Sequence, residues 1–160
     1  MKHLWSIMLA VAMLFAIPAQ AQEKNMENLQ KVKDYLTECK VFYVATTDGD
    51  QPRVRPFGVA EIYNGRLYIM TGKSKRVFKQ ITANPKFEIV ALKPSGTEWI
   101  RISGKLNCDD EVATKEFLLD ENPGLKGMYS ATDNNMAALY ITEGTATMSS
   151  FMAKEETINF

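Results

Sequence analysis

The sequence predicts a mainly β protein: a small antiparallel Greek-key β-barrel with a few peripheral helices. Short apolar runs alternate with turn residues along most of the chain, at Asp48-Gly49-Asp50, Asn64-Gly65 and Pro94-Ser95-Gly96. The Asn64-Gly65 pair is the strongest hairpin signal, because a two-residue hairpin turn needs residues that tolerate positive φ. No internal repeat, low-complexity segment or linker divides the chain, so we expect a single domain.

The elements follow in order along the chain. Residues 25–40 form a predicted helix, because apolar side chains recur there at helical spacing, at Met26, Leu29, Val32, Leu36 and Cys39. A second helix is predicted over residues 110–119, and residues 121–135 are polar and rich in turn residues, which is typical of a loop. Strands are predicted over residues 41–47, 52–60, 61–70 (a hairpin), 87–92, 99–106, 138–151 and 155–160.

Residues 1–21 have the pattern of a signal peptide. Lys2 and His3 form a short positive start, residues 4–17 are apolar, and Ala19-Gln20-Ala21 has the small-x-small form of a cleavage site. The apolar run is too short for a comfortable membrane span, so we expect no stable membrane anchor after cleavage. We therefore expect residues 22–160 to form an exported protein, periplasmic or secreted.

Composition excludes several classes of function. The chain has 19 Lys and Arg against 19 Asp and Glu, so it lacks the basic field of a nucleic-acid-binding protein. His3 is its only histidine, so leader removal leaves no imidazole for a metal, for haem or for general base catalysis, and we expect no metal site. Cys39 and Cys108 are favoured as free thiols, although an oxidising compartment permits a disulfide between them.

A strand, a turn and a helix follow one another over residues 68–81. Thr71-Gly72 makes the turn, Ser74 is a favourable N-cap residue, and Asn84-Pro85 ends the helix. Cations crowd the start of this helix, where its dipole disfavours them: Lys73, Lys75, Arg76 and Lys79. A bound anion such as a phosphate would resolve this conflict. The alternative is a solvated basic face on a surface helix.

Two arginines mark the second strand. Arg53 and Arg55 point to one face, about 6.5 Å apart, while Val54 points to the other. Paired guanidiniums suit an anion or a polarised carbonyl, but a solvent-facing strand explains them equally well. The strand over residues 99–106 places Trp99 and Arg101 on its outer face, where they fit a partner subunit, a flat ligand or a crossing helix.

Four ordered motifs resemble one family. They are Val44 to Phe57 with its Pro-Arg-Val-Arg-Pro core, Leu67 to Lys75, Asn84-Pro85, and Arg101 to Gly104. Their order and spacing are similar to the pyridoxamine 5′-phosphate oxidase-like, FMN-binding split-barrel family across essentially all of residues 22–160. The resemblance implies a six-stranded split barrel, usually a homodimer, with FMN at each end of the subunit interface.

The resemblance also implies roles for individual residues. The strand formed by Arg53, Val54, Arg55 and Pro56 would run along the isoalloxazine and ribityl chain of FMN. Thr71 would lie beside the cofactor, and Ser74 and Lys75 would hold its phosphate. Trp99 and Arg101 would lie near the interface or the partner's flavin. The chain ends Thr157 to Phe160, without the Arg-x-x-Pro segment of true pyridoxamine phosphate oxidases.

The leading hypothesis is an exported FMN-binding protein that acts as a flavin-dependent oxidoreductase on a small molecule. The flavin would supply the redox chemistry, while the protein binds and orients it. One alternative is a non-enzymatic module that binds another phosphorylated or planar ligand in the same pocket. Another is a barrel with an empty pocket and a structural role as a dimer.

Overall fold

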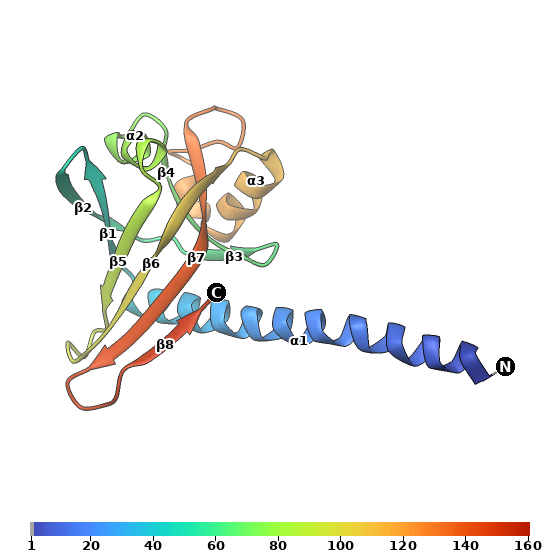
Figure 1. Cartoon of the computed structure of the whole chain (residues 1–160). Coiled ribbons are helices and arrows are strands. Elements are labelled where there is room, and N and C mark those ends of the chain that lie inside the picture. The colour runs from blue at the N-terminus through green and yellow to red at the C-terminus, as the bar shows by residue number, and fades with distance from the viewer. Residues whose placement is uncertain (1) are drawn as a thin grey trace.

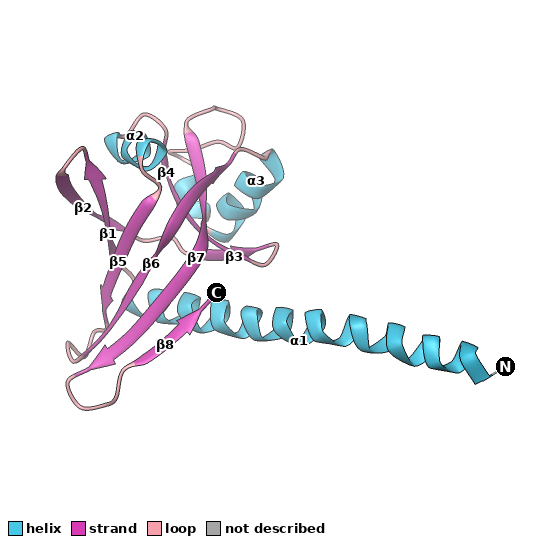
Figure 2. Ribbon diagram, viewed as in Figure 1, coloured by secondary structure: helices cyan, strands magenta, loops and turns pink. Residues whose placement is uncertain are grey.

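A single antiparallel sheet forms the body of the protein. The computed structural model describes residues 2–160, with the side chains of the first helix described from Gln20 onward. Figures 1 and 2 show the strongly curved sheet, in the order β2-β1-β5-β6-β7-β4-β3 with β8 paired to β7. The elements are α1 (Lys2–Cys39), β1 (Phe42–Asp48), β2 (Gln51–Phe57), β3 (Glu61–Tyr63), β4 (Arg66–Gly72), α2 (Arg76–Ala83), β5 (Lys86–Leu92), β6 (Glu98–Asp109), α3 (Val112–Glu121), the 3₁₀ turn η1 (Pro123–Leu125), β7 (Met136–Ser150) and β8 (Glu156–Asn159).

The mainly β class is confirmed, and the architecture is consistent with a split barrel. The strand count is eight rather than the six that the family resemblance implied. Two short strands account for the difference: β3, which the Asn64-Gly65 turn separates from β4, and β8 at the chain end. Asn64 and Gly65 have φ values of 47° and 72°, as the predicted hairpin turn requires.

Strand alternation builds the main core. Phe42 and Val44 of β1, Ile89 of β5, and Ile100 and Ile102 of β6 all point inward and are buried. Two helices cover this core. The predicted helix over residues 25–40 is the C-terminal part of α1 and contributes Leu29, Val32 and Leu36, while α2 contributes Val77 and Ile81. A second cluster, which includes Tyr68, Leu118, Leu119 and Met136, packs β4 and β7 against α3.

The chain end is part of the fold. The predicted last strand is present as β8, and the backbone of Phe160 exchanges two hydrogen bonds with Gly144, of 2.9 and 3.1 Å. The side-chain amide of Asn28 on α1 donates to the backbone carbonyl of Asn159 on β8. The ammonium of Lys31 on α1 donates to the carboxylate of Glu156 on β8. The C-terminal strand therefore ties α1 to β7. Cys39 and Cys108 are free thiols in the structure.

The predicted leader lies almost entirely outside the residues whose side chains are described, so its removal stays a prediction. Within the described part of the chain, no helix is both long and apolar enough to cross a membrane. We expect export to remove residues 1–21 and leave Gln22 first, and the intact mass of the protein from its native envelope tests this. A mass that still includes Met1 would contradict the leader hypothesis.

Gly104 allows the two longest strands to bend together. β6 and β7 pair along most of their length, with a register shift between Ser103 and Lys105. At this bulge Gly104 has φ 159°, and a methyl group on it would lie 2.7 Å from the carbonyl oxygen of Thr142. Because that oxygen belongs to the backbone of the neighbouring strand, it cannot move aside without disturbing the pairing.

We therefore expect Gly104→Ala to lower the free energy of unfolding by about 1–3 kcal/mol, the usual cost of overpacking. Gly127→Ala is the matched control, since a methyl group at Gly127 meets nothing within 4 Å. Urea denaturation of both variants measures the difference. Equal stability of the two variants would show that the close approach at Gly104 has no energetic weight.

Candidate functional site

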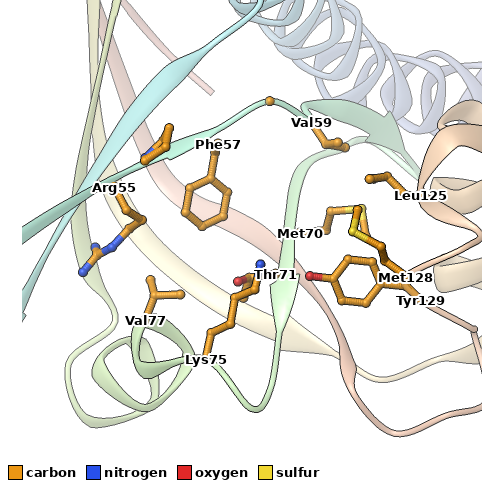
Figure 3. Close-up of a pocket in the computed structure, with 12 residues that line it drawn as sticks. Arg55, Phe57, Val59, Met70, Thr71, Lys75, Val77, Leu125, Met128 and Tyr129 are labelled. Carbon is orange, nitrogen blue, oxygen red and sulfur yellow. The ribbon is translucent and has the colours of Figure 1, made fainter.

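A pocket of about 210 Å³ lies where β2, β4 and the start of α2 meet the segment that follows α3. Figure 3 shows Arg55 and Phe57 on one side and Leu125, Met128 and Tyr129 on the other, with Thr71 and Lys75 between them. Four residues that the sequence analysis named line this pocket: Arg55, Pro56, Thr71 and Lys75. The remaining lining residues are Phe57, Gly58, Val59, Met70, Val77, Leu125, Met128 and Tyr129.

The strand, turn and helix predicted over residues 68–81 are present, but Ser74 does not cap the helix. The N-cap position of α2 is Lys75, without a side-chain cap hydrogen bond. The amide of Ser74 instead donates to Oδ1 of Asn135 at 3.2 Å, and the amide of Lys73 donates to the carbonyl of Asn135 at 2.6 Å. Two amides at the start of the helix region are thus bonded to Asn135 and are not free to bind an anion.

The four cations around the helix start separate from one another. Lys73 pairs with Asp110 at 2.6 Å, and the buried Lys115 reaches the same carboxylate oxygen at 3.1 Å. The hydrogen bond from Lys73 lowers the pKa of Asp110, and the same bond raises the pKa of Lys73. Arg76 and Lys79 line a different depression, beside the β1–β2 turn. Of the four, only Lys75 lines the pocket.

Lys75 faces an aromatic ring rather than an acid. Its ammonium lies 5.9 Å from the centroid of the Tyr129 ring, within the range of a cation–π contact. Among the described ion pairs, none involves Lys75. The ammonium therefore keeps its charge available to a ligand in the pocket.

Arg53 and Arg55 share a face of β2, as predicted, but they do not share a site. They lie opposite Thr46 and Val44 of β1, while Val54 is exposed on the other face. Arg53 is a solvent-exposed residue whose Nε lies 3.6 Å from Asp48, and it does not line the pocket. Only Arg55 contributes to the pocket.

Three neutral oxygens hold the guanidinium of Arg55. Nη1 donates to the carbonyl of Val44 at 3.0 Å and to Oγ1 of Thr46 at 2.7 Å, and Nη2 donates to Oε1 of Gln80 at 2.6 Å. Oγ1 of Thr46 in turn donates to Oε1 of Gln80 at 2.8 Å. Burial lowers the pKa of Arg55 below its ordinary value, and the nearby charge of Arg53 acts in the same direction.

Trp99 and Arg101 lie apart from the pocket, on the outer face of the sheet. Arg101 forms an ion pair with Glu88, and the ring of Trp99 packs against Phe151 with centroids 5.3 Å apart. Strand register places Leu92 beside Trp99 and Val90 beside Arg101. Within one chain, neither residue belongs to the same site as Lys75 and Arg55.

Sequence reasoning missed the apolar wall of the pocket. Leu125, Met128 and Tyr129 come from the polar segment that we predicted only as a loop. The backbone amides of Met128 and Tyr129 donate hydrogen bonds of 2.9 and 3.0 Å to the carbonyl of Leu125, and these bonds fix the conformation of the wall. The one available signal was a pair of large side chains, Met128 and Tyr129, within a stretch otherwise rich in Gly and Asn.

The pocket thus has a cationic edge and an apolar, aromatic wall. Its charged lining residues are Arg55 and Lys75, and none of the described residues that line it is a carboxylate. Such a lining suits a ligand that is planar and apolar in one part and anionic in another.

Comparison with known proteins places this chain in a family. A model described as pyridoxamine 5′-phosphate oxidase matches residues 29–124. A nimc/nima family protein from Clostridium acetobutylicum has 42% identity and a TM-score of 0.84, over 88% of this chain and 98% of its own. A search of curated protein sequences finds no match.

More distant structures share the fold. A pyridoxamine 5′-phosphate oxidase-related, FMN-binding protein from Nostoc punctiforme has 14% identity and a TM-score of 0.52, over 84% of this chain and 94% of its own. A heme-binding protein from Mycobacterium smegmatis has 12% identity and a TM-score of 0.62, over 79% of this chain and 57% of its own. The family model covers more than half of the chain, and the chain therefore belongs to the pyridoxamine 5′-phosphate oxidase family.

Proposed function

We propose that this protein is an exported, FMN-binding oxidoreductase that acts on a small molecule. The observation that carries the proposal is that one pocket combines an apolar, aromatic wall with two cations, Arg55 and Lys75, which form no ion pair with any residue that the structure describes. FMN has the matching chemistry, since a dianionic phosphate is joined through a polar chain to a planar ring system. The name of the N. punctiforme protein, which binds FMN, supports the same assignment.

The residues present fit FMN, although fewer of the expected residues line the pocket than the sequence hypothesis named. Lys75, at the start of α2, would hold the phosphate. Ser74 is the weaker candidate, because its amide is already bonded to Asn135. Phe57, Met70 and Tyr129 would contact the ring, and Thr71, whose side chain is buried, would lie beside it.

When bound, the flavin would supply the redox chemistry, and the protein would control its surroundings. The apolar wall would exclude water from one side of the ring. Arg55 would place a fixed positive charge at the pocket edge and so favour the more negatively charged form of the bound ligand. The lining residues include no carboxylate or histidine, so any protein proton donor among them would be Tyr129 or Lys75.

The second candidate is a binding module without catalysis. The same lining would hold another phosphorylated or planar ligand, and heme binding by a distant structural neighbour shows that the fold is not restricted to flavins. The visible absorption spectrum of the purified protein separates the two. A bound flavin that is reduced and then reoxidised by an added small molecule supports the enzyme, whereas a colourless protein that takes up no flavin supports the module.

The phosphate assignment can be tested with one lysine. Losing one charge-assisted hydrogen bond typically costs about 1.5–3 kcal/mol, so Lys75→Ala should weaken FMN binding roughly ten- to a hundredfold. Riboflavin lacks the phosphate, so its affinity should barely change. Titration of flavin-free protein, followed by quenching of flavin fluorescence, measures both affinities.

Lys79→Ala is the matched control, because Lys79 lies on the same helix but lines a different depression. We expect it to change FMN affinity less than twofold. If wild-type protein binds FMN and riboflavin equally, or if the two lysine variants behave alike, Lys75 has no special role with phosphate.

We also propose that the protein is a homodimer, formed through the outer face of the sheet. An exposed apolar strip crosses this face, made of Tyr43, Val90, Leu92 and Phe151 with the half-buried Trp99 beside them. Strips of this kind on a sheet commonly bind another subunit. The family resemblance also implies a homodimer, with Trp99 and Arg101 near the interface or the partner's flavin.

Val90→Glu places a charge in the centre of this strip, so we expect it to convert a dimer to a monomer at micromolar concentration. Val112→Glu is the control, because Val112 has a similar exposure, 44% against 42% for Val90, but lies on α3. Light scattering measures the mass, and Trp99, the only tryptophan in residues 22–160, should report the change by a red-shifted emission. A monomeric wild-type protein would contradict the proposal.

A further inference from the structure

The contacts of Arg55 are unusual for a partly buried charge. Buried ionic groups are normally paired with an opposite charge. Arg55 instead meets the backbone oxygen of Val44 and the neutral side chains of Thr46 and Gln80. Thr46 and Gln80 are themselves buried, with 3% and 7% of their surfaces exposed. Among the described residues, none forms an ion pair with Arg55.

The three side chains form a closed set of hydrogen bonds. The hydroxyl of Thr46 accepts from Arg55 and donates to Oε1 of Gln80, while the same oxygen of Gln80 accepts from Arg55. This arrangement fixes the guanidinium between β1, β2 and α2. In Figure 3 the guanidinium lies at the edge of the pocket opposite Leu125, Met128 and Tyr129.

A purely structural link between β2 and α2 would favour a different residue at position 80. A carboxylate in place of the Gln80 amide would accept the same hydrogen bond, strengthen it and neutralise the guanidinium. The amide of Gln80 holds the Arg55 guanidinium in the same position, but it does not neutralise the positive charge of the guanidinium. The cost of keeping that charge partly desolvated is visible in the lowered pKa of Arg55, for which burial is the main cause.

We infer that Gln80 and Thr46 are positioning residues, which fix the Arg55 guanidinium at the pocket edge and leave its charge available to the bound ligand. The inference rests on the proposed function, with FMN as the ligand. It assigns a role to two buried residues that do not line the pocket.

The central experiment uses Gln80→Glu, a nearly isosteric change that neutralises Arg55. We expect FMN affinity to fall about tenfold or more, while the melting temperature of the flavin-free protein stays the same or rises because a buried ion pair replaces a neutral contact. A purely structural role predicts the same or higher melting temperature with unchanged FMN affinity. Thr82→Glu is the control, since it adds the same charge to the exposed side of the same helix, and we expect less than a twofold change.

A second variant tests the same inference if Gln80→Glu fails to fold. Thr46→Val keeps the shape of the side chain but removes one acceptor of Arg55, so we expect FMN affinity to fall several-fold without any change in charge. In an Arg55→Met background, Gln80→Glu should weaken FMN no further, because the charge that it neutralises is already gone.

Each result decides between the hypotheses. If wild-type protein binds FMN and both Gln80→Glu and Thr46→Val bind it within twofold of wild type, the inference is wrong and the proposed function stands. Equal losses in Gln80→Glu and Thr82→Glu would also overturn it, since the effect would then be a general effect of charge. If wild-type protein binds no FMN, the proposed function fails and the inference fails with it.

Discussion

β6 and β7 pair along most of their length, and every other strand of the sheet is attached to this pair directly or through neighbouring strands. These two long strands carry β5 on one side and both β4 and β8 on the other. The bulge at Gly104 lets the two strands bend together, so that their pairing continues as one ladder from the β5 side of the sheet to the β4 side. Because β8 pairs with β7 and contacts α1, the cover of the main core also depends on this ladder.

The same ladder sets the position of the candidate site. β4 pairs with β7 in a register that places Gly72 opposite Met136. Asn135, which directly precedes β7, therefore lies against Lys73 and Ser74 and bonds to both of their amides. A turn that would otherwise be a mobile surface segment is held in place, and the start of α2 is positioned beside Arg55 and the Leu125–Tyr129 wall.

Charge around the pocket is controlled mainly by which cations find partners. Asp110 pairs with both Lys73 and Lys115, and Asp48 lies beside Arg53, whereas Arg55 and Lys75 contact neutral groups. Lys75 is exposed, and a surface ion pair would contribute little to stability there. Arg55 is partly buried, and burying a charge without an opposite partner costs free energy, so folding alone gives no reason for this arrangement. Selection for an anionic ligand gives such a reason, and it connects the proposed function with the role inferred for Gln80 and Thr46.

Features that depend on local pattern could be predicted from the sequence. Alternating apolar residues and the Asn64-Gly65 turn predicted the mainly β class and the β3–β4 hairpin, and the spacing of Leu29, Val32 and Leu36 predicted the buried face of α1. The strand, turn and helix around Gly72 also followed from local signals, and one of the four cations named there, Lys75, lines the pocket.

Which of these residues contact one another depends on long-range packing and could not be predicted from the sequence. Ser74 bonds to Asn135, which is 61 residues away in the sequence, and Arg55 bonds to Gln80, which is 25 residues away. Neither contact produces a periodic pattern of residues from which it could be predicted. Arg53 and Arg55 share a face of one strand but have different partners. Arg53 lies near the carboxylate of Asp48 beside the β1–β2 turn, whereas Arg55 donates to the neutral amide of Gln80 on α2. Strand register and helix packing separate residues that alternation alone makes equivalent, because these long-range contacts depend on the whole sheet.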